Sequence, residues 1–496
     1  MPPDNLTSIA EAAEPSLVRF ARRIVFASAL AIGLGAALFY ANQDLTLSHY
    51  DARAHLVVAR RVVDSLTPGW RQFGAVWLPL PHLLNVLPVQ WDWAYRTGVV
   101  AVLLSAGAFA CGLSALAGLI ARETGSRVAA IAMPLAILVN PSVLYLQATP
   151  MTEPLMLGCA LVALACVTDW QRHPDPTRLR RAGWILAALA WTRYEGWAIA
   201  AALLGLSTLA VRGADAWRQL RTLAIYPAAA VALFLVHSWA ATGAWFVTGG
   251  FFTPDNPAYH EPRVALTQVF DATVALGGRA LVMTGLLGVG VALVRSWRDR
   301  AALLPLALAA AAALPLSAFY AGHPLRVRYM VPLVVACGAL AGLALARVPR
   351  RWRGGLAIAW AGAAMLTTPP LDSRAPMVQE AQWERPFQRQ REQVTAYLAA
   401  RHDGTLILAS MGSLGHYMQE SASIGLTLRQ YLHEGNGDLW SAALLSPARH
   451  VRWVLTEERA EGGDMLAALA HADPQWLAGF ARVAEGGGLV LYKKTP

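Results

Sequence analysis

Residues 19–40 of this 496-residue chain read RFARRIVFASALAIGLGAALFY, in which three arginines precede a long apolar run. An apolar run of this kind, 24–40, can enter a membrane as a helix. No small-x-small cleavage site follows it, so the sequence predicts an uncleaved signal anchor. Because Arg19, Arg22 and Arg23 precede the run, the N-terminus is predicted to lie in the cytoplasm.

The rest of the chain repeats this pattern. It is 56% hydrophobic and only 15% charged, a composition that favours a bilayer as its solvent. Segment 182–211 carries Arg193 and Glu195 at its middle, where charges are costly in lipid, so it is predicted to form two short helices that meet at the outer face. With this division the sequence predicts a polytopic α-helical protein of about eleven spans. The apolar segments lie at 20–40, 93–120, 127–145, 153–168, 182–211, 222–241, 266–294, 301–320, 330–346 and 355–369.

The arginines between the spans indicate which loops share a side. They concentrate in alternate loops on the side of the N-terminus, which the positive-inside rule makes cytoplasmic. The formal net charge is +10, but these arginines punctuate apolar segments and do not line one face, so nucleic acid is not expected as a partner. A catalytic site is therefore expected on the outer side, which receives 41–92, 146–152, 192–196, 242–265, 321–329 and everything beyond about 370.

Two outer loops are long enough to have a structure of their own. In the first, 41–92, apolar and charged residues alternate from 53 to 65 as in an interfacial amphipathic helix. Arg60 and Arg61 are more easily explained there as lipid anchors than as ligand contacts. The proline-rich stretch 77–91 is predicted to form a broken segment at headgroup level, so that this loop would roof a cavity. The second, 242–265, with its paired glycines and phenylalanines (249–252), is either a gating flap or an ordinary loop.

The composition becomes that of a soluble domain after Pro370. Short apolar runs predict buried strands at 405–410, 451–456 and 488–492, and helices are predicted around 391–401 and 464–471. The chain is therefore divided into a membrane domain, 1–370, and a small extracytoplasmic α/β domain, 371–496.

Two acidic residues are the first candidates for chemistry. Asp51 follows the first span in SHYDARAH (48–55), where a positioned carboxylate could take a proton from an acceptor hydroxyl or amine; an Asp that caps the following helix is the structural alternative. Glu153, at the start of the fourth span, could orient an acceptor or share a divalent cation with Asp51. It could equally be a first-turn Glu favoured by the helix dipole. Whether a metal takes part stays open.

The other candidates are mostly basic. Arginines in a short outer loop go against the positive-inside rule, so His323, Arg326 and Arg328 point to an anionic partner such as a phosphodiester, with lipid headgroups as the alternative. Arg193 either pairs with Glu195 or reaches a phosphate. His55 and Glu195 are candidates for contacting the substrate, and neither His55 nor His82 has the spacing of a zinc site.

These motifs resemble a known family. YDARAH (50–55), LTPGW (66–70) and WLPLPH (77–82) look like those of the GT-C superfamily of membrane glycosyltransferases, among bacterial relatives of the protein O-mannosyltransferases and the aminoarabinose lipid A transferase. The resemblance implies that Asp51 is the catalytic base and maps the second acidic motif loosely onto Glu153. It also implies that Arg326 and Arg328 hold a lipid phosphate. The mannosyltransferases carry Asp-Glu where this chain has Asp51-Ala52, which weakens the case for a protein acceptor.

The implied activity is transfer of a sugar from a polyprenyl-phosphate donor to a glycan, lipid or protein acceptor, by inverting displacement, at the outer face of a bacterial inner membrane. Two other functions would use similar residues. A transporter or flippase of lipid-linked intermediates would bind phosphate during passage, although it predicts inverted repeats that the sequence does not show. A ligase that moves a whole lipid-linked glycan is not separated by sequence.

Overall fold

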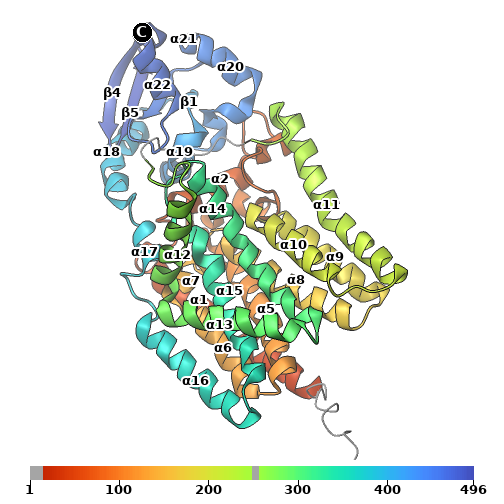
Figure 1. Cartoon of the computed structure of the whole chain (residues 1–496). Coiled ribbons are helices and arrows are strands. Elements are labelled where there is room, and N and C mark those ends of the chain that lie inside the picture. Colours follow the sequence, from red (N-terminus) through yellow and green to blue (C-terminus); the bar gives the residue numbers. More distant parts are fainter. Residues whose placement is uncertain (1–14, 248–255) are drawn as a thin grey trace, which may run out of the picture.

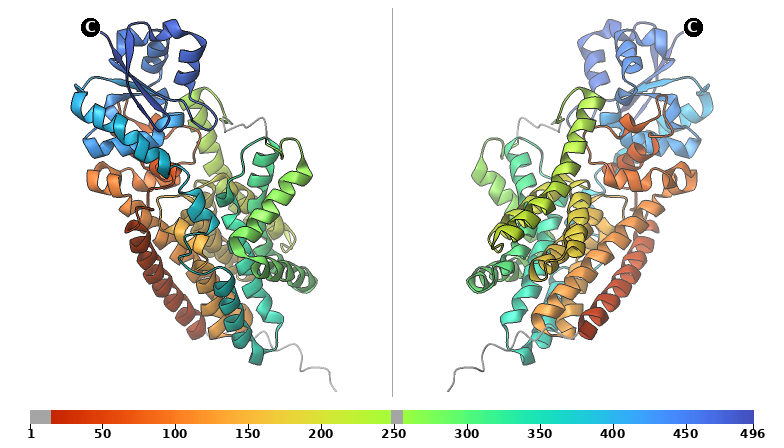
Figure 2. Two further views of the ribbon diagram at one scale, coloured as in Figure 1. Left: turned by 90° about the vertical axis from the view of Figure 1, so that its left-hand side faces the viewer. Right: turned by 90° about the vertical axis from the view of Figure 1, so that its right-hand side faces the viewer.

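The computed structural model describes residues 15–247 and 256–496. A bundle of helices carries, at one end, a smaller domain with a β-sheet, and the first outer loop lies between the two (Figure 1). The side views in Figure 2 show the same arrangement, with the C-terminal domain stacked on that end of the bundle. The gating flap proposed for 242–265 centres on 249–252, which lie outside the described residues.

Seven helices in the described ranges are long and apolar enough to cross a membrane, or up to eight if a pair bent by 74° counts as one span. The structure thus confirms a polytopic helical protein, but the predicted number of about eleven spans is not confirmed. The seven are α1 (Pro15–Ala41), α5 (Val99–Thr124), α8 (Glu153–Arg172), α11 (Ala214–Thr242), α13 (Arg279–Ser296), Arg300–Tyr320 (η3 and α14) and Val327–Arg347 (η4, α15 and η5). The bent pair is α6 (Arg127–Leu138) with α7 (Pro141–Gln147), and the shorter bundle helices are α9 (Pro176–Ala190), α10 (Tyr194–Thr208), α12 (Pro262–Gly277) and α16 (Arg350–Thr367).

Some of the apolar segments are broken. Segment 182–211 forms two helices, α9 and α10, as predicted from its central charges. Segment 266–294, predicted as one span, is instead the two helices α12 and α13. They are separated at Gly278, whose φ of +79° is a conformation that glycine adopts without a steric penalty. The sequence marks this break by Gly277, Gly278 and the charged Arg279, which the prediction of one span did not take into account.

The arginine-rich loops predicted to be cytoplasmic meet at one end of the bundle. Glu123 pairs with Arg172 and with Arg295, the latter at 2.5 Å. Asp169 pairs with Arg122 at 3.3 Å and Arg178 at 3.1 Å. Glu123 and Asp169 belong to the C-terminal turns of α5 and α8, and these ends of the two helices lie away from the C-terminal domain (Figure 1). Three of the loops that were predicted to share a side, those around 122–127, 172–181 and 295–300, therefore share an end of the molecule.

The described part of the C-terminal domain contains a five-stranded sheet in the order β2-β1-β3-β5-β4. Strand β1 is parallel to β2 and β3, whereas β5 is antiparallel to β3 and β4. The predicted strands correspond to β1, β3 and β5, and the predicted helices to α18 and α22. The elements are α17 (Pro376–Glu380), α18 (Arg385–Arg401), β1 (Ile407–Ala409), α19 (Met411–Glu420), β2 (Tyr431–Leu432), α20 (Asp438–Leu445), α21 (Pro447–His450), β3 (Trp453–Glu457), α22 (Met465–Ala472), β4 (Phe480–Gly486) and β5 (Leu489–Lys494).

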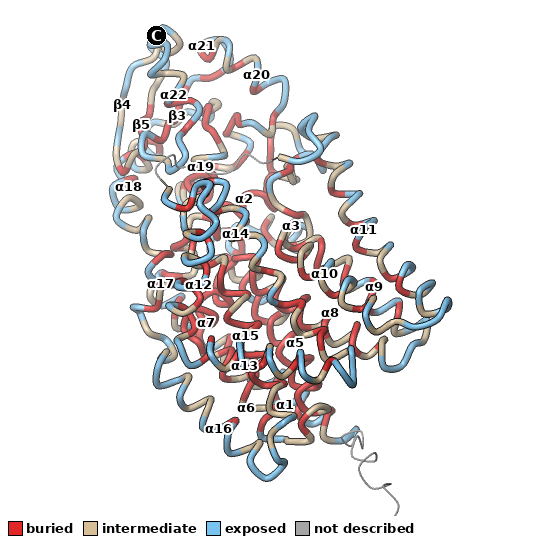
Figure 3. The backbone as a smooth tube through the Cα atoms, viewed as in Figure 1, coloured by how far each residue is buried: buried red, intermediate tan, exposed pale blue. Residues whose placement is uncertain are grey.

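The first helix of loop 41–92 is buried against the C-terminal domain. This helix, α2 (Tyr50–Arg60), packs Leu56 and Val57 into the same apolar cluster as Leu414 and Tyr417 of α19. Figure 3 shows α2 among the buried parts of the chain. The helix predicted at 53–65 therefore exists, but its interfacial position is wrong, because the C-terminal domain covers the apolar face that was expected to meet lipid. Beyond it the loop contains η1 (Trp70–Phe73), α3 (Leu80–Asn85), η2 (Pro88–Gln90) and α4 (Asp92–Thr97).

Candidate active site

A cavity of about 1710 Å³ lies where the first outer loop, the bundle and the C-terminal domain meet. One side of α2 lines it, from Tyr50 and Asp51 through His55 to Arg61 after the helix end. The lining also includes the turn between α9 and α10. The loop before α3 is fixed to that turn, because Leu80 N donates to the Trp191 carbonyl at 2.9 Å and the Tyr194 hydroxyl donates to the Val76 carbonyl at 3.0 Å.

Asp51 lies in the first turn of α2 but does not cap it. The N-cap is His49, whose Nδ1 accepts from the Asp51 backbone N–H at 3.1 Å. The Asp51 carboxylate is therefore available to the cavity, where it forms an ion pair with Arg328. Burial, the largest single influence, would raise its pKa, but the charge and hydrogen bond of Arg328, together with His49 and His55, hold the pKa below the usual range. Asp51 is thus ionised and engaged with a cation.

Behind this pair the charges alternate in a buried network. Glu153, which is fully buried, lies 3.9 Å from Arg328 and 3.0 Å from Arg193. Arg193 in turn contacts Glu195 at 2.8 Å and donates to the Thr152 hydroxyl at 3.0 Å. Paired in this way, both guanidinium groups can be kept charged in a desolvated site.

Some of the site residues predicted from the sequence line the cavity and others do not. The cavity is lined by Asp51, His55, Arg193, Glu195, His323 and Arg328. Glu153 lies outside the lining and contacts both arginines from behind. Arg326 also lies outside it: this side chain pairs with Glu461 and sits over the Trp383 ring, 5.6 Å from its centroid. Of the two neighbouring arginines, only Arg328 is therefore in place to meet a ligand.

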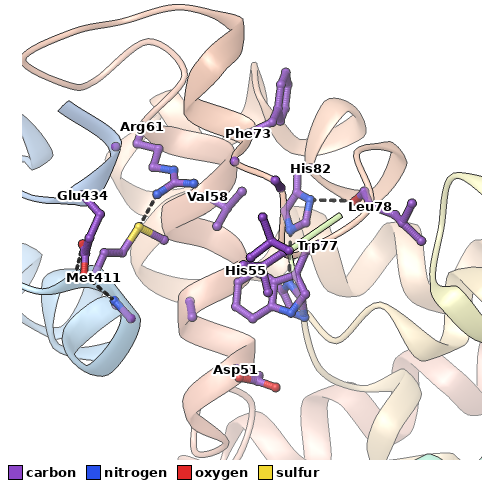
Figure 4. Close-up of a pocket in the computed structure, with 18 of the residues that line it drawn as sticks. Asp51, His55, Val58, Arg61, Phe73, Trp77, Leu78, His82, Met411 and Glu434 are labelled. Carbon is purple, nitrogen blue, oxygen red and sulfur yellow. Dashed lines mark hydrogen bonds between the residues drawn. The ribbon is translucent and has the colours of Figure 1, made fainter. Parts of the chain in front are cut away.

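His55 belongs to a chain of hydrogen bonds beside Asp51 (Figure 4). His82 Nδ1 lies 3.1 Å from the Leu78 carbonyl, which can only accept, so His82 carries its proton on Nδ1. Its Nε2 must then accept from His55 Nδ1, 3.1 Å away. That leaves the lone pair of His55 on Nε2. Burial lowers the pKa of both imidazoles, that of His82 to about 3, so this chain is neutral.

Buried neutral histidines make stability depend on pH. Burial holds the pKa values of His82, His416 and His433 at about 3 each, against about 6.5 in an unfolded chain. Below about pH 6.5 the unfolded chain binds protons at these histidines, whereas the folded chain does not. The free energy of unfolding is therefore highest above this pH and decreases as the pH falls. We expect a loss of about 1 kcal/mol per histidine between pH 7.5 and 5.5. The apparent Tm in detergent checks this; a Tm that stays constant over that interval would contradict it, and His82→Gln should weaken the dependence.

Several residues of the site were not assigned by sequence. Glu380 of α17 accepts from the Val327 N–H at 2.7 Å and lies 3.7 Å from His49 Nε2. Trp77 lies beside His55, with ring centroids 4.2 Å apart and the ring planes tilted by 46°. The spacing of Asp51 and His55, one helical turn apart, was a readable sign that both face the same way. No sequence signal connects His49 with Glu380, because that contact is purely tertiary.

A divalent cation has no obvious set of ligands. Within residues 15–247 and 256–496, no three His, Cys, Asp or Glu side chains come together as a metal site. Asp51, Glu153 and Glu195 instead face guanidinium groups.

The chain is similar to known proteins in structure, but no similarity in sequence is found. No family model and no curated protein matches the sequence. Among solved structures, ArnT from Cupriavidus metallidurans bound to undecaprenyl phosphate matches with a TM-score of 0.57 and 16% identity, over 93% of this chain and 97% of that chain. The apo state of the same protein gives 0.55 with the same identity and coverage. The likeness shows that this chain has the same overall fold as ArnT.

Proposed function

We propose that the chain is a GT-C glycosyltransferase that moves a sugar from a polyprenyl-phosphate donor to an acceptor at the outer face of a bacterial inner membrane. The observation that carries this proposal is the Asp51–Arg328 pair on the wall of a cavity that opens between the bundle and the C-terminal domain. A carboxylate beside a guanidinium offers a base for the acceptor and a cation for a leaving phosphate in one place. The ArnT structure holds undecaprenyl phosphate, which supports the same class of donor here.

The arginines would bind the donor through its phosphate. Arg328 and Arg193 both line the cavity, and both are backed by Glu153. Guanidinium groups bind phosphate oxygens by paired hydrogen bonds. As the bond to the sugar breaks, the phosphate gains negative charge, so these contacts strengthen toward the transition state. His323, on the same lining, is placed to contact the phosphate as well.

Donor binding would also prepare the base. In the structure Arg328 is engaged with Asp51 and holds its pKa low. A phosphate that takes over Arg328 removes part of this effect, so the proton affinity of Asp51 rises when the donor is in place. The acceptor oxygen then bonds to C1 as its proton passes to Asp51, and the C1–O bond to phosphate breaks with its electron pair leaving on the phosphate. The result is a single inverting displacement.

The proposed position of the cavity on the outer side of the membrane is based on the basic loops. The arginines of 122–127, 172–181 and 295–300 gather at the end of the bundle away from the cavity. Cytoplasmic loops carry such an excess, so the cavity and the C-terminal domain are assigned to the periplasmic side. Polyprenyl-phosphate donors suit that side because they need no nucleotide.

The test is transfer of labelled sugar. Purified protein is incubated with synthetic polyprenyl-phosphate sugars and a native membrane extract, with and without EDTA. Label should move from one donor into an extractable acceptor. If the protein binds the donors and transfers from none of them under varied acceptors and metals, a transporter of lipid-linked intermediates becomes the better explanation.

A further inference from the structure

Arg61 is a buried cation that nothing in the proposed reaction uses. It follows the last turn of α2, is 7% exposed and lines the cavity. Its Nε donates to the Gln72 carbonyl and its Nη1 faces the Met411 thioether, a weak acceptor (Figure 4). Among the described residues, no carboxylate lies within 4 Å of this guanidinium. The expected role as a lipid anchor is therefore wrong for Arg61, which faces the cavity.

Glu434, the carboxylate whose charge affects Arg61, is hydrogen-bonded to other groups. Burial lowers the pKa of Arg61 to about 10, and the charge of Glu434 opposes this effect only in part. Glu434 caps α19: it accepts from the Ser410 hydroxyl and from the Met411 N–H, the latter at 2.7 Å. The nearby imidazoles of His82 and His433 have pKa values of about 3 and supply no negative charge. The charge of Arg61 is thus left without a close counter-ion.

The surrounding loop is shaped to hold this guanidinium. Gly74 has a φ of +70°, and a Cβ there would lie 2.8 Å from Arg61 Nη2. Gln72, whose carbonyl accepts from Arg61, donates through its side chain to the Gly435 carbonyl at 2.8 Å. The membrane domain and the C-terminal domain together therefore keep an isolated cation at the cavity wall. A merely structural side chain at this place would be apolar, because burying an uncompensated charge is costly.

We propose that Arg61 is the anion-binding end of an acceptor subsite, where it takes a phosphate or carboxylate carried by the acceptor; this rests on the proposed function. Asp51 and Arg61 are ten residues apart along α2, or about 15 Å at the rise of an α-helix. The donor phosphate is bonded to the sugar carbon that reacts beside Asp51, so it must lie near Arg328. Arg61 is too far away to hold that phosphate at the same time. The acceptor therefore carries its anionic group toward the Arg61 end of α2, away from the reacting oxygen beside Asp51.

The experiment measures anion binding directly. The full-length protein in detergent is first saturated with undecaprenyl phosphate, which occupies the Arg328 end of the cavity. Inorganic phosphate is then titrated at constant ionic strength, and the shift in Tm gives its affinity. The variants are R61Q and R61K. The matched control is R60Q, because the neighbouring Arg60 pairs with Asp64 at 2.9 Å and Asp92 at 2.6 Å and does not line the cavity.

R61Q should weaken the phosphate response by about tenfold or more, while R61K and R60Q retain it. The two Gln variants should also differ before phosphate is added. R61Q should unfold at the same temperature as the wild type or higher, because it removes an uncompensated buried charge, whereas R60Q should unfold at a lower one.

An R61Q phosphate response equal to that of the wild type would overturn the proposal. So would an R61Q protein that no longer responds to undecaprenyl phosphate, because Arg61 would then hold the donor. If undecaprenyl phosphate changes the Tm of no variant, the donor assignment fails, and the dependence of the inorganic phosphate response on Arg61 still decides this proposal.

Discussion

Asp51→Asn should lower kcat for sugar transfer by roughly 10²–10⁴-fold, the usual contribution of a general base. Asn keeps the size of the side chain but cannot take the acceptor proton. Donor affinity should stay the same or rise, because Arg328 loses its competing carboxylate. The measurement is transfer of label under saturating donor, together with donor binding by Tm shift.

Asp51→Glu is the control, since it keeps a carboxylate on the same turn and should retain more activity than the Asn variant. A folded Asp51→Asn protein with near wild-type kcat would remove Asp51 as the base. His55 would then be the next residue to test, because its Nε2 carries a lone pair beside the same cavity.

Arg328→Gln should weaken donor binding by roughly 10- to 100-fold, the worth of a charge-assisted contact, and should lower kcat as well because the leaving phosphate loses its cation. It should also change the pH profile. Without Arg328, burial raises the pKa of Asp51, so the base is protonated at a higher pH. The acid limb of kcat/KM therefore moves to higher pH.

The neighbouring arginine is a close control for this variant. Arg326 pairs with Glu461 and lies outside the cavity lining, so Arg326→Gln changes the net charge by the same amount without touching the proposed donor site. Equal losses of donor affinity in both variants would mean that the effect comes from the overall field and not from a contact at Arg328.

The sequence predicted much of the fold because membrane helices require long apolar segments, which are easy to recognise between charged loops. Apolar length and arginine position revealed the bundle, and the charges of Arg193 and Glu195 revealed the break between α9 and α10. The break at Gly278 was missed, although Gly277, Gly278 and Arg279 interrupt the apolar segment in the sequence. Strand β4 was also missed, because none of its residues is fully buried and they do not form an apolar run.

The site was predicted less completely for a physical reason. Asp51 and Arg328 could be chosen separately, one as an acid near a span and one as an arginine on the outer side. Their direct pairing, and the separation of Arg328 from Arg326, depend on how distant segments pack. The prediction for Arg61 was wrong for the same reason. Its neighbours in the sequence are typical of an interfacial helix, but in the structure the C-terminal domain covers this helix and buries Arg61.

The double use of α2 limits how modular this protein can be. One face of the helix carries Asp51 and His55, and another is packed by α19. A chain cut at residue 370 would lose the partner of Leu56 and Val57 and with it the support of the helix that holds the base. Exchanging C-terminal domains between relatives would meet the same obstacle, since a graft must bring a matching α2. The two regions are therefore expected to change together in evolution, as one unit assembled from distant parts of the chain.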